Sequence, residues 1–230
     1  MTGLVRNATL LSLGGLFVTG TVMASPPSGT FSTFPPNNCV KLVGKNLSGL
    51  ADAAGTFTII VRTGGGNLVP NSNVVLDFSS CPDVHMASQA DLLGLAGNPN
   101  AGLTENAVFK TVTRAAGPTN GQATGQVSFT LLGGSTVGGN GSGALCARVI
   151  ADNVQIGTLT IAVYDGDGSR TIDSGDLSGA MADTFAPGSG STAKVRSDFD
   201  CNGTVNSGDL SALLSVTLGP FVNGPASYGW

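Results

Sequence analysis

The C-terminal third of the chain is organised around Asp165-Gly-Asp167-Gly-Ser169-Arg-Thr171-Ile-Asp173-Ser-Gly-Asp176-Leu177. The same pattern recurs as Asp198-Phe-Asp200-Cys-Asn202-Gly-Thr204-Val-Asn206-Ser-Gly-Asp209-Leu210. Oxygen-bearing side chains stand at the first, third, fifth, ninth and twelfth places of both copies, the spacing with which a chain can curl around Ca²⁺. The eighth-place residues, Ile172 and Val205, are expected to pair as a short strand. The doubled pattern therefore predicts two calcium-binding loops held back to back.

Each loop is followed by a stretch with the apolar spacing of a helix, at 177–185 and 210–218. Neither loop follows a stretch that could form an entering helix, because 155–163 has the pattern of a strand and 188–192 that of a linker. Each unit is therefore predicted to be a loop followed by one helix, with Asp as the twelfth ligand.

This doubled loop–helix pattern resembles a type I dockerin over about residues 163–220. The resemblance implies a small α-helical module, at 164–220, that binds two calcium ions and docks onto a cohesin partner. It also implies that the tenth and eleventh places help to select that partner, namely Ser174, Gly175, Ser207 and Gly208. The implied calcium ligands are the side chains of Asp165, Asp167, Ser169, Asp173, Asp176, Asp198, Asp200, Asn202, Asn206 and Asp209, with the backbone carbonyls of Thr171 and Thr204.

The first loop departs from the family pattern in two ways. Arg170 stands where a sharply turning Gly is usual, although Gly tolerates positive φ and Arg does not. Ser169 stands where a stronger ligand is common. The spacer between the copies, 186–196, is also longer than a compact dockerin needs. The second loop is therefore predicted to be the tighter site.

Residues 1–24 have the pattern of a secretory signal peptide. One basic residue, Arg6, precedes an uncharged apolar run, and small residues at Val22 and Ala24 precede a Pro-rich leader at 25–37. The alternative is a membrane anchor, but the Gly-rich run is short and weakly apolar for spanning. The sequence thus predicts export of a bacterial protein to the cell surface or medium, without membrane insertion after signal removal.

Four cysteines fit an exported protein: Cys39, Cys81, Cys146 and Cys201. An even count in a secreted chain favours two disulfides, for which three pairings exist. Because Cys81 follows one expected strand and Cys146 lies in another, Cys81–Cys146 is favoured, which leaves Cys39–Cys201. The alternatives are four reduced thiols or a zinc site, and wide spacing and a single histidine disfavour zinc.

The composition indicates a β-rich body and excludes nucleic acid as a partner. The chain has 35 Gly among 230 residues and only 10% charged residues, which is typical of secreted β-proteins. Its net charge is −4, whereas a nucleic-acid-binding surface needs clustered basic residues. Seven strands and intervening turns predict an immunoglobulin-like β-sandwich at 38–163, with a jelly roll as the alternative topology. The expected strands are 39–43, 56–62, 74–78, 107–113, 126–132, 145–150 and 155–163.

The body also resembles the bacterial immunoglobulin-like repeats of the invasin kind, over roughly 53–163. The resemblance rests on Val69-Pro70 with Val74, on Thr111-Val-Thr113, and on Gly125-Gln-Val-Ser-Phe129. It implies a spacer or adhesion domain without chemistry of its own.

Catalytic residues are not expected. The single histidine, His85, follows Asp83 in a predicted loop, and the chain has no G-x-S-x-G motif. The apolar tail at 221–230 either packs against the loop–helix pair or engages a neighbour. Three hypotheses follow: a non-catalytic calcium-dependent attachment protein that binds an extracellular, cohesin-like partner; a structural subunit that binds copies of itself in a surface layer or filament; and, less favoured, a polysaccharide-active enzyme carried on a dockerin.

Overall fold

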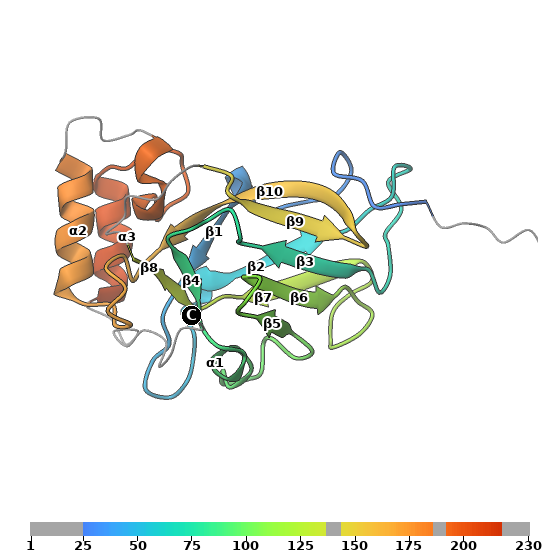
Figure 1. Ribbon diagram of the computed structural model, residues 1–230, viewed down its shortest axis with the longest axis horizontal. Coiled ribbons are helices and arrows are strands. Elements are labelled where there is room, and N and C mark those ends of the chain that lie inside the picture. The colour runs from blue at the N-terminus through green and yellow to red at the C-terminus, as the bar shows by residue number, and fades with distance from the viewer. Residues whose placement is uncertain (1–24, 137–143, 186–191, 218–230) are drawn as a thin grey trace, which may run out of the picture.

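The computed structural model describes residues 25–136, 144–185 and 192–217, which form a mainly-β domain followed by a small region with two helices (Figure 1). The expected signal peptide at 1–24 and the tail at 221–230 lie outside the described residues, as does most of the spacer. Within the part of the chain that is described, no helix is long and apolar enough to cross a membrane.

A curled sheet of six strands forms the centre of the β-domain, with the order β1-β10-β9-β3-β6-β5 (Figure 1). β1 pairs parallel with β10, and the other neighbours are antiparallel. β10 lies between β1 and β9, and all of its last five residues are buried. The strands are β1 (Cys39–Leu42), β3 (Asn73–Asp77), β5 (Thr104–Asn106), β6 (Thr111–Ala115), β9 (Ala147–Ala151) and β10 (Val154–Val163).

Two smaller ladders complete the β-domain. β2 (Thr56–Ile60) pairs with β7 (Gln126–Thr130), and β4 (Val84–Met86) pairs with β8 (Gly133–Ser135). Phe57 and Phe129 stand opposite each other across the first ladder, and their rings stack with centroids 5.7 Å apart. Two single bridges join this ladder to the six-stranded sheet, one just after β1, between Val43 and Leu132, and one just after β6, between Gly117 and Thr124. The apolar core therefore lies inside a half-barrel.

The expected strands coincide with observed strands, with one shift. The stretch predicted at 107–113 is only half strand, because β6 begins at Thr111 and the preceding residues form a turn in which Lys110 has a φ of 49°. β4, β5 and β8 were not predicted, since three residues are too few to show an alternation of apolar and polar side chains.

The Pro-rich segment at 25–37 lies along β2. The amides of Ser28 and Thr33 donate to the carbonyls of Arg62 and Ile60 at 2.8 and 2.9 Å. A Cβ built on Gly157 of β10 would meet the ring of Phe34 at 2.6 Å, so this strand accepts only glycine beneath that ring. The short helices of the β-domain are η1 (Pro36–Asn38), η2 (Ala53–Gly55) and α1 (Gln89–Leu93).

The helical region contains α2 (Ser174–Phe185), η3 (Thr192–Ser197) and α3 (Ser207–Thr217), and α2 and α3 lie side by side (Figure 1). Ala180 of α2 and Leu213 of α3 are buried. The acidic side chain of Asp183 is also buried, because the Lys194 ammonium at 3.0 Å and the Ser197 hydroxyl at 2.7 Å donate to it.

Two disulfides form, with the pairing favoured from the sequence. Cys81–Cys146 lies within the β-domain, and Cys39–Cys201 connects β1 to the second acidic loop across 162 residues of sequence. Disulfides of this kind persist in oxidising compartments.

Candidate metal centres

The two acidic loops occupy equivalent places before the two helices. The first loop leaves β10 directly and leads into α2, whereas the second leaves η3 and leads into α3. The predicted order of loop and then helix, without an entering α-helix, is therefore what the described residues show. Ile172 and Val205 are both buried, but the predicted short strand between them is not observed, because they form no bridge among the described residues.

Each loop gathers three carboxylates. One oxygen from each member of a triad lies within 4.8 Å of the others. Calcium holds its oxygens at 2.3–2.6 Å, so two ligands of one ion stand at most about 5.2 Å apart, and each triad fits this limit. The triads are Asp165, Asp167 and Asp176 in the first loop, and Asp198, Asp200 and Asp209 in the second.

The twelfth-place carboxylates organise both loops through backbone amides. In the first loop, Asp176 accepts from the amide of Gly166 at 2.7 Å through one oxygen and from that of Asp173 at 2.8 Å through the other. In the second loop, Asp209 accepts from the amide of the third-place Asp200 at 2.9 Å through one oxygen and from that of the ninth-place Asn206 at 2.8 Å through the other. The third-place amide of the first loop, that of Asp167, likewise donates to Asp176, at 3.4 Å. The repeated sequence therefore produces a repeated hydrogen-bond scheme.

The ninth-place residues cap the helices. Asp173 accepts from the amide of Gly175 and Asn206 from that of Gly208, both at 2.7 Å, which satisfies an unpaired donor at each helix start. These two side chains thus close the loop and begin the helix at the same time.

The remaining expected ligands bond to one another inside their loops. The Ser169 hydroxyl donates to the Thr171 carbonyl at 2.9 Å, and the Thr171 hydroxyl donates to Asp173 at 3.2 Å. In the second loop, the Asn202 amide group donates to Asp200 at 2.7 Å and that of Asn206 donates to the Thr204 carbonyl at 3.2 Å. The carboxylates form the centre of each site, with these groups around them.

No family model, curated protein or solved structure matches the chain. The interpretation of the two loops consequently rests on their own residues and geometry.

The residues expected to select a partner lie at the first turns of α2 and α3. Ser174, Gly175 and Ser207 are exposed, and Gly208 is half-buried. The glycines also have a local reason, since a Cβ on Gly175 would meet a carboxylate oxygen of Asp167 at 2.6 Å, and one on Gly208 would meet Asp200 at 3.0 Å. The eleventh place must stay small for the carboxylates to converge.

The sixth place differs between the loops as the sequence indicates. Arg170 has a φ of 71° where Gly203 has a φ of 87°. The left-handed conformation costs an L-residue roughly 1–2 kcal/mol. Glycine adopts it without that steric cost, and the extra conformational entropy that glycine loses on folding costs less than this amount.

We expect Arg170→Gly to raise the calcium affinity of the first loop by up to about fivefold, or roughly 1 kcal/mol, because it relieves this backbone conformation. The matched change, Gly203→Arg, should weaken the second loop by a similar factor. Calorimetric titration of both variants measures the two sites separately. Equal affinities in Arg170→Gly and the parent would show that the φ value is not what limits the first loop.

Burial shifts the titration of the first triad. Burial foremost, and then the charge of Asp176, raises the pKa of Asp165 to about 7. Burial foremost, and then the charge of Asp167, raises the pKa of Asp176 to about 6. The pKa values of Asp198 and Asp209 are raised in the same way, mainly by burial. The raised pKa values mean that negative charge on these carboxylates is unfavourable in each loop, and a bound cation would remove that cost.

The protein without calcium is accordingly expected to lose stability as the pH rises from about 4 to 7. A carboxyl whose folded pKa lies above its unfolded value stabilises the fold below the unfolded pKa, and that contribution disappears as the pH rises through the folded pKa. Melting curves in calcium-depleted buffer measure the trend, and Asp165→Asn should flatten it. A melting temperature that rises between pH 4 and 7 would contradict the raised pKa values of Asp165 and Asp176.

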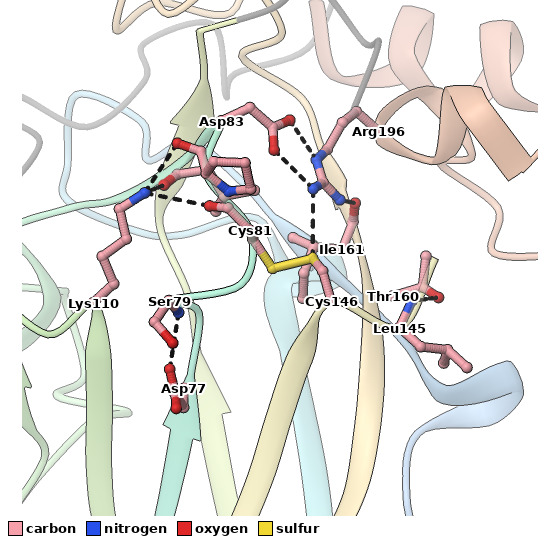
Figure 2. The surroundings of a disulfide bond; sticks show 12 residues. Asp77, Ser79, Cys81, Asp83, Lys110, Leu145, Cys146, Thr160, Ile161 and Arg196 are labelled. Atoms are coloured by element: carbon pink, nitrogen blue, oxygen red, sulfur yellow. Dashed lines mark hydrogen bonds and ion pairs between the residues drawn. A yellow bond between two sulfur atoms is a disulfide. The ribbon is translucent and has the colours of Figure 1, made fainter. Parts of the chain in front are cut away.

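His85, the single histidine, lies in β4 opposite Gly134 of β8. Burial foremost, and then the charge of Lys110, lowers the pKa of His85 to about 4, so its ring is neutral at pH 7. Lys110 donates to the carbonyls of Cys81, Pro82 and Val84 at 3.3, 3.1 and 3.0 Å and thereby fixes the turn that precedes β4 (Figure 2).

One contact of the second loop was not visible in the sequence. Arg196, at the end of η3, is fully buried and forms an ion pair with Asp83 of the β-domain (Figure 2). No local pattern marks this pair, since its partners lie 113 residues apart. A second such contact joins the rings of Tyr164 and Phe199, whose centroids are 5.3 Å apart.

Proposed function

We propose that the protein is a secreted, calcium-binding protein that acts in extracellular attachment. The observation that carries the calcium assignment is the pair of Asp triads, each with its twelfth-place carboxylate bonded to the amides of the third and ninth places. Surface acidic residues without such order repel one another, whereas here two buried carboxylates and one exposed carboxylate in each loop converge to distances that suit one hard cation. Extracellular calcium is concentrated enough to fill even weak loops of this type.

Secretion is supported by the two disulfides together with the signal-like pattern at 1–24. The Cys39–Cys201 disulfide matters to the proposed site, because Cys201 belongs to the second loop itself. An oxidising environment thus provides both the covalent bond and the ion that the helical region needs.

We further propose that the helical region is a dockerin-like module that binds a cohesin-like partner. Two loop–helix units without entering α-helices support this proposal, as do the near-identical first turns of α2 and α3. For the β-domain, we propose the role of an immunoglobulin-like spacer or adhesion domain. Its support is the alternation of buried and more exposed residues along β6 and β7.

A structural subunit that self-associates is the second candidate. It is favoured by Val108 and Phe109, two neighbouring apolar residues that are 85% and 66% exposed at the turn between β5 and β6. β5 is an edge strand of the six-stranded sheet, so this turn lies where another copy could pair.

Calorimetric titration with calcium at pH 7 tests the proposed function. We expect two sites in the parent and one in Asp198→Ala, with a melting temperature that rises with calcium concentration in both. Asp152→Asn, on the turn between β9 and β10, is a control that should keep two sites. A parent chain that takes up no calcium would overturn the proposal.

Two further measurements separate the candidates. For attachment, an immobilised type I cohesin should retain the protein in calcium and release it in chelator, and Ser174→Arg with Ser207→Arg should abolish retention. For self-assembly, light scattering should show larger particles in calcium, and Phe109→Ser should reduce them. A strict monomer at high concentration counts against the structural subunit.

A further inference from the structure

Neither calcium loop has an entering α-helix, so other elements must fix the first ligand of each. In the first loop, β10 runs through Val163 and Tyr164 directly into Asp165. β8 continues alongside, where the amide of Ser135 donates to the carbonyl of Asp165 at 2.9 Å. The backbone of Asp165, the first ligand of this loop, thus continues β10 and is hydrogen-bonded to β8.

In the second loop, the corresponding anchor is Arg196, two residues before Asp198. Its guanidinium meets both oxygens of Asp83, at 2.9 Å from Nε and at 3.0 Å from Nη2. Nη1 donates to the carbonyl of Ile161 at 2.8 Å, and Nη2 lies 3.5 Å from the sulfur of Cys146 (Figure 2). Ile161 belongs to β10, the strand that leads into the first loop. β10 therefore also bonds to Arg196, the residue that leads into the second loop.

Asp83 connects the same anchor to the first loop. Its carboxylate accepts from the Ser135 hydroxyl at 3.2 Å, and its backbone carbonyl accepts from the amide of Thr136 at 3.0 Å. Burial alone would raise the pKa of Asp83, but the hydrogen bonds and charge of Arg196 hold it below its usual value. We call Arg196, Asp83, Ser135 and Ile161 the Arg196 cluster.

We propose that Arg196 is a positioning residue for calcium in both loops and that the Arg196 cluster couples the two sites. The proposal rests on the proposed calcium binding and extends it. The backbone of Asp165 bonds to Ser135 of this cluster, and Asp198 follows Arg196 by two positions, so binding at either loop orders a first ligand that is attached to the same cluster. Calcium in one loop therefore favours the arrangement that the other loop requires, and the two sites bind with positive cooperativity.

A purely structural role would have a different signature. A buried ion pair that only joins two parts of the protein would change the melting temperature and leave calcium affinity unaltered. Arg114 provides the matched control, because it is also fully buried and donates to backbone carbonyls, those of Pro99, Ala101 and Ser128. None of these partners belongs to either loop.

The experiment compares Arg196→Met with Arg114→Met by calorimetric titration of the full chain with calcium. Residues that orient metal ligands typically alter metal affinity by about 10–100-fold. We expect Arg196→Met to weaken the second site by about tenfold or more and the first site measurably, while Arg114→Met keeps both affinities at a lower melting temperature. Near-UV circular dichroism at saturating calcium verifies the fold. If Arg196→Met does not fold, Arg196→Lys, which retains the charge but not the paired geometry, should show the same loss of affinity.

Coupling is measured with Asp198→Ala, which removes the second site. In the parent, this change should weaken the first site by at least about fivefold, and in the Arg196→Met background by less than about twofold. Unchanged affinities in both Arg196 variants, or the same effect of Asp198→Ala in both backgrounds, would overturn the positioning role. Absence of calcium binding in the parent would instead overturn the proposed function, so the two failures are distinguishable.

Discussion

Asp83→Ala is expected to lower the free energy of unfolding by about 3–5 kcal/mol, because it leaves the buried guanidinium of Arg196 without its carboxylate. Water cannot take the place of Asp83, since the Arg196 side chain is 0% exposed. Domains of this size have total stabilities of about 5–15 kcal/mol, so the change is large. Urea unfolding at saturating calcium measures it.

The ion pair between Arg148 and Asp77 supplies the comparison for Asp83→Ala. The Arg148 side chain is 44% exposed, so Arg148→Met should cost no more than about 1 kcal/mol. Asp83→Asn should lie between the two, because it keeps one acceptor for Arg196. A cost for Asp83→Ala no larger than that for Arg148→Met would show that the second loop is not anchored through Arg196.

Cys39→Ser with Cys201→Ser is expected to cost about 2–5 kcal/mol of stability and to weaken the second calcium site more than the first. The bond closes a long loop, with a separation of 162 positions between its cysteines, and Cys201 stands at the fourth place of the second acidic loop. Its backbone has a φ of 59°, and its carbonyl accepts from the side chain of Asn37. Loss of the disulfide thus releases the backbone of the second loop at Cys201 from β1.

The first calcium site serves as the internal control for the disulfide variant. Calorimetry on the double Ser variant should show a smaller loss of affinity at the first loop, through the proposed coupling, than at the second, and denaturant unfolding gives the stability loss. Equal weakening of both sites would mean that the disulfide acts only through global stability.

The acidic loops were predictable because their information is local. Carboxylates at fixed spacing converge by following the turns of their own segment, and Asp173 and Asn206 cap the helices that start beside them. The left-handed backbone at Arg170 likewise follows from its place in the repeat. For the same reason, strands such as β2 and β7, whose side chains alternate, were found at nearly their observed positions.

Contacts between distant segments were beyond a single sequence. The parallel pairing of β1 with β10 and the ion pair of Asp83 with Arg196 join positions more than a hundred residues apart, and neither leaves a periodic trace. β8 reads Gly-Gly-Ser, which has no apolar pattern, although it carries the contact to Asp165. The disulfide pairing could be predicted because four cysteines permit only three combinations and because Cys81 and Cys146 lie at expected strands.

The bond between Cys39 and Cys201 also determines how the protein would respond to mechanical tension. A pull between β1 and the second loop would pass through one sulfur–sulfur bond, and the chain between Cys39 and Cys201, which are 162 positions apart in sequence, would bear none of that tension. β1 lies beside β10 with Cys39 opposite Thr160, so the bond also protects this parallel pair from being peeled apart. A force applied between the helical region and β1 would therefore act along a short covalent path while the apolar core stays folded.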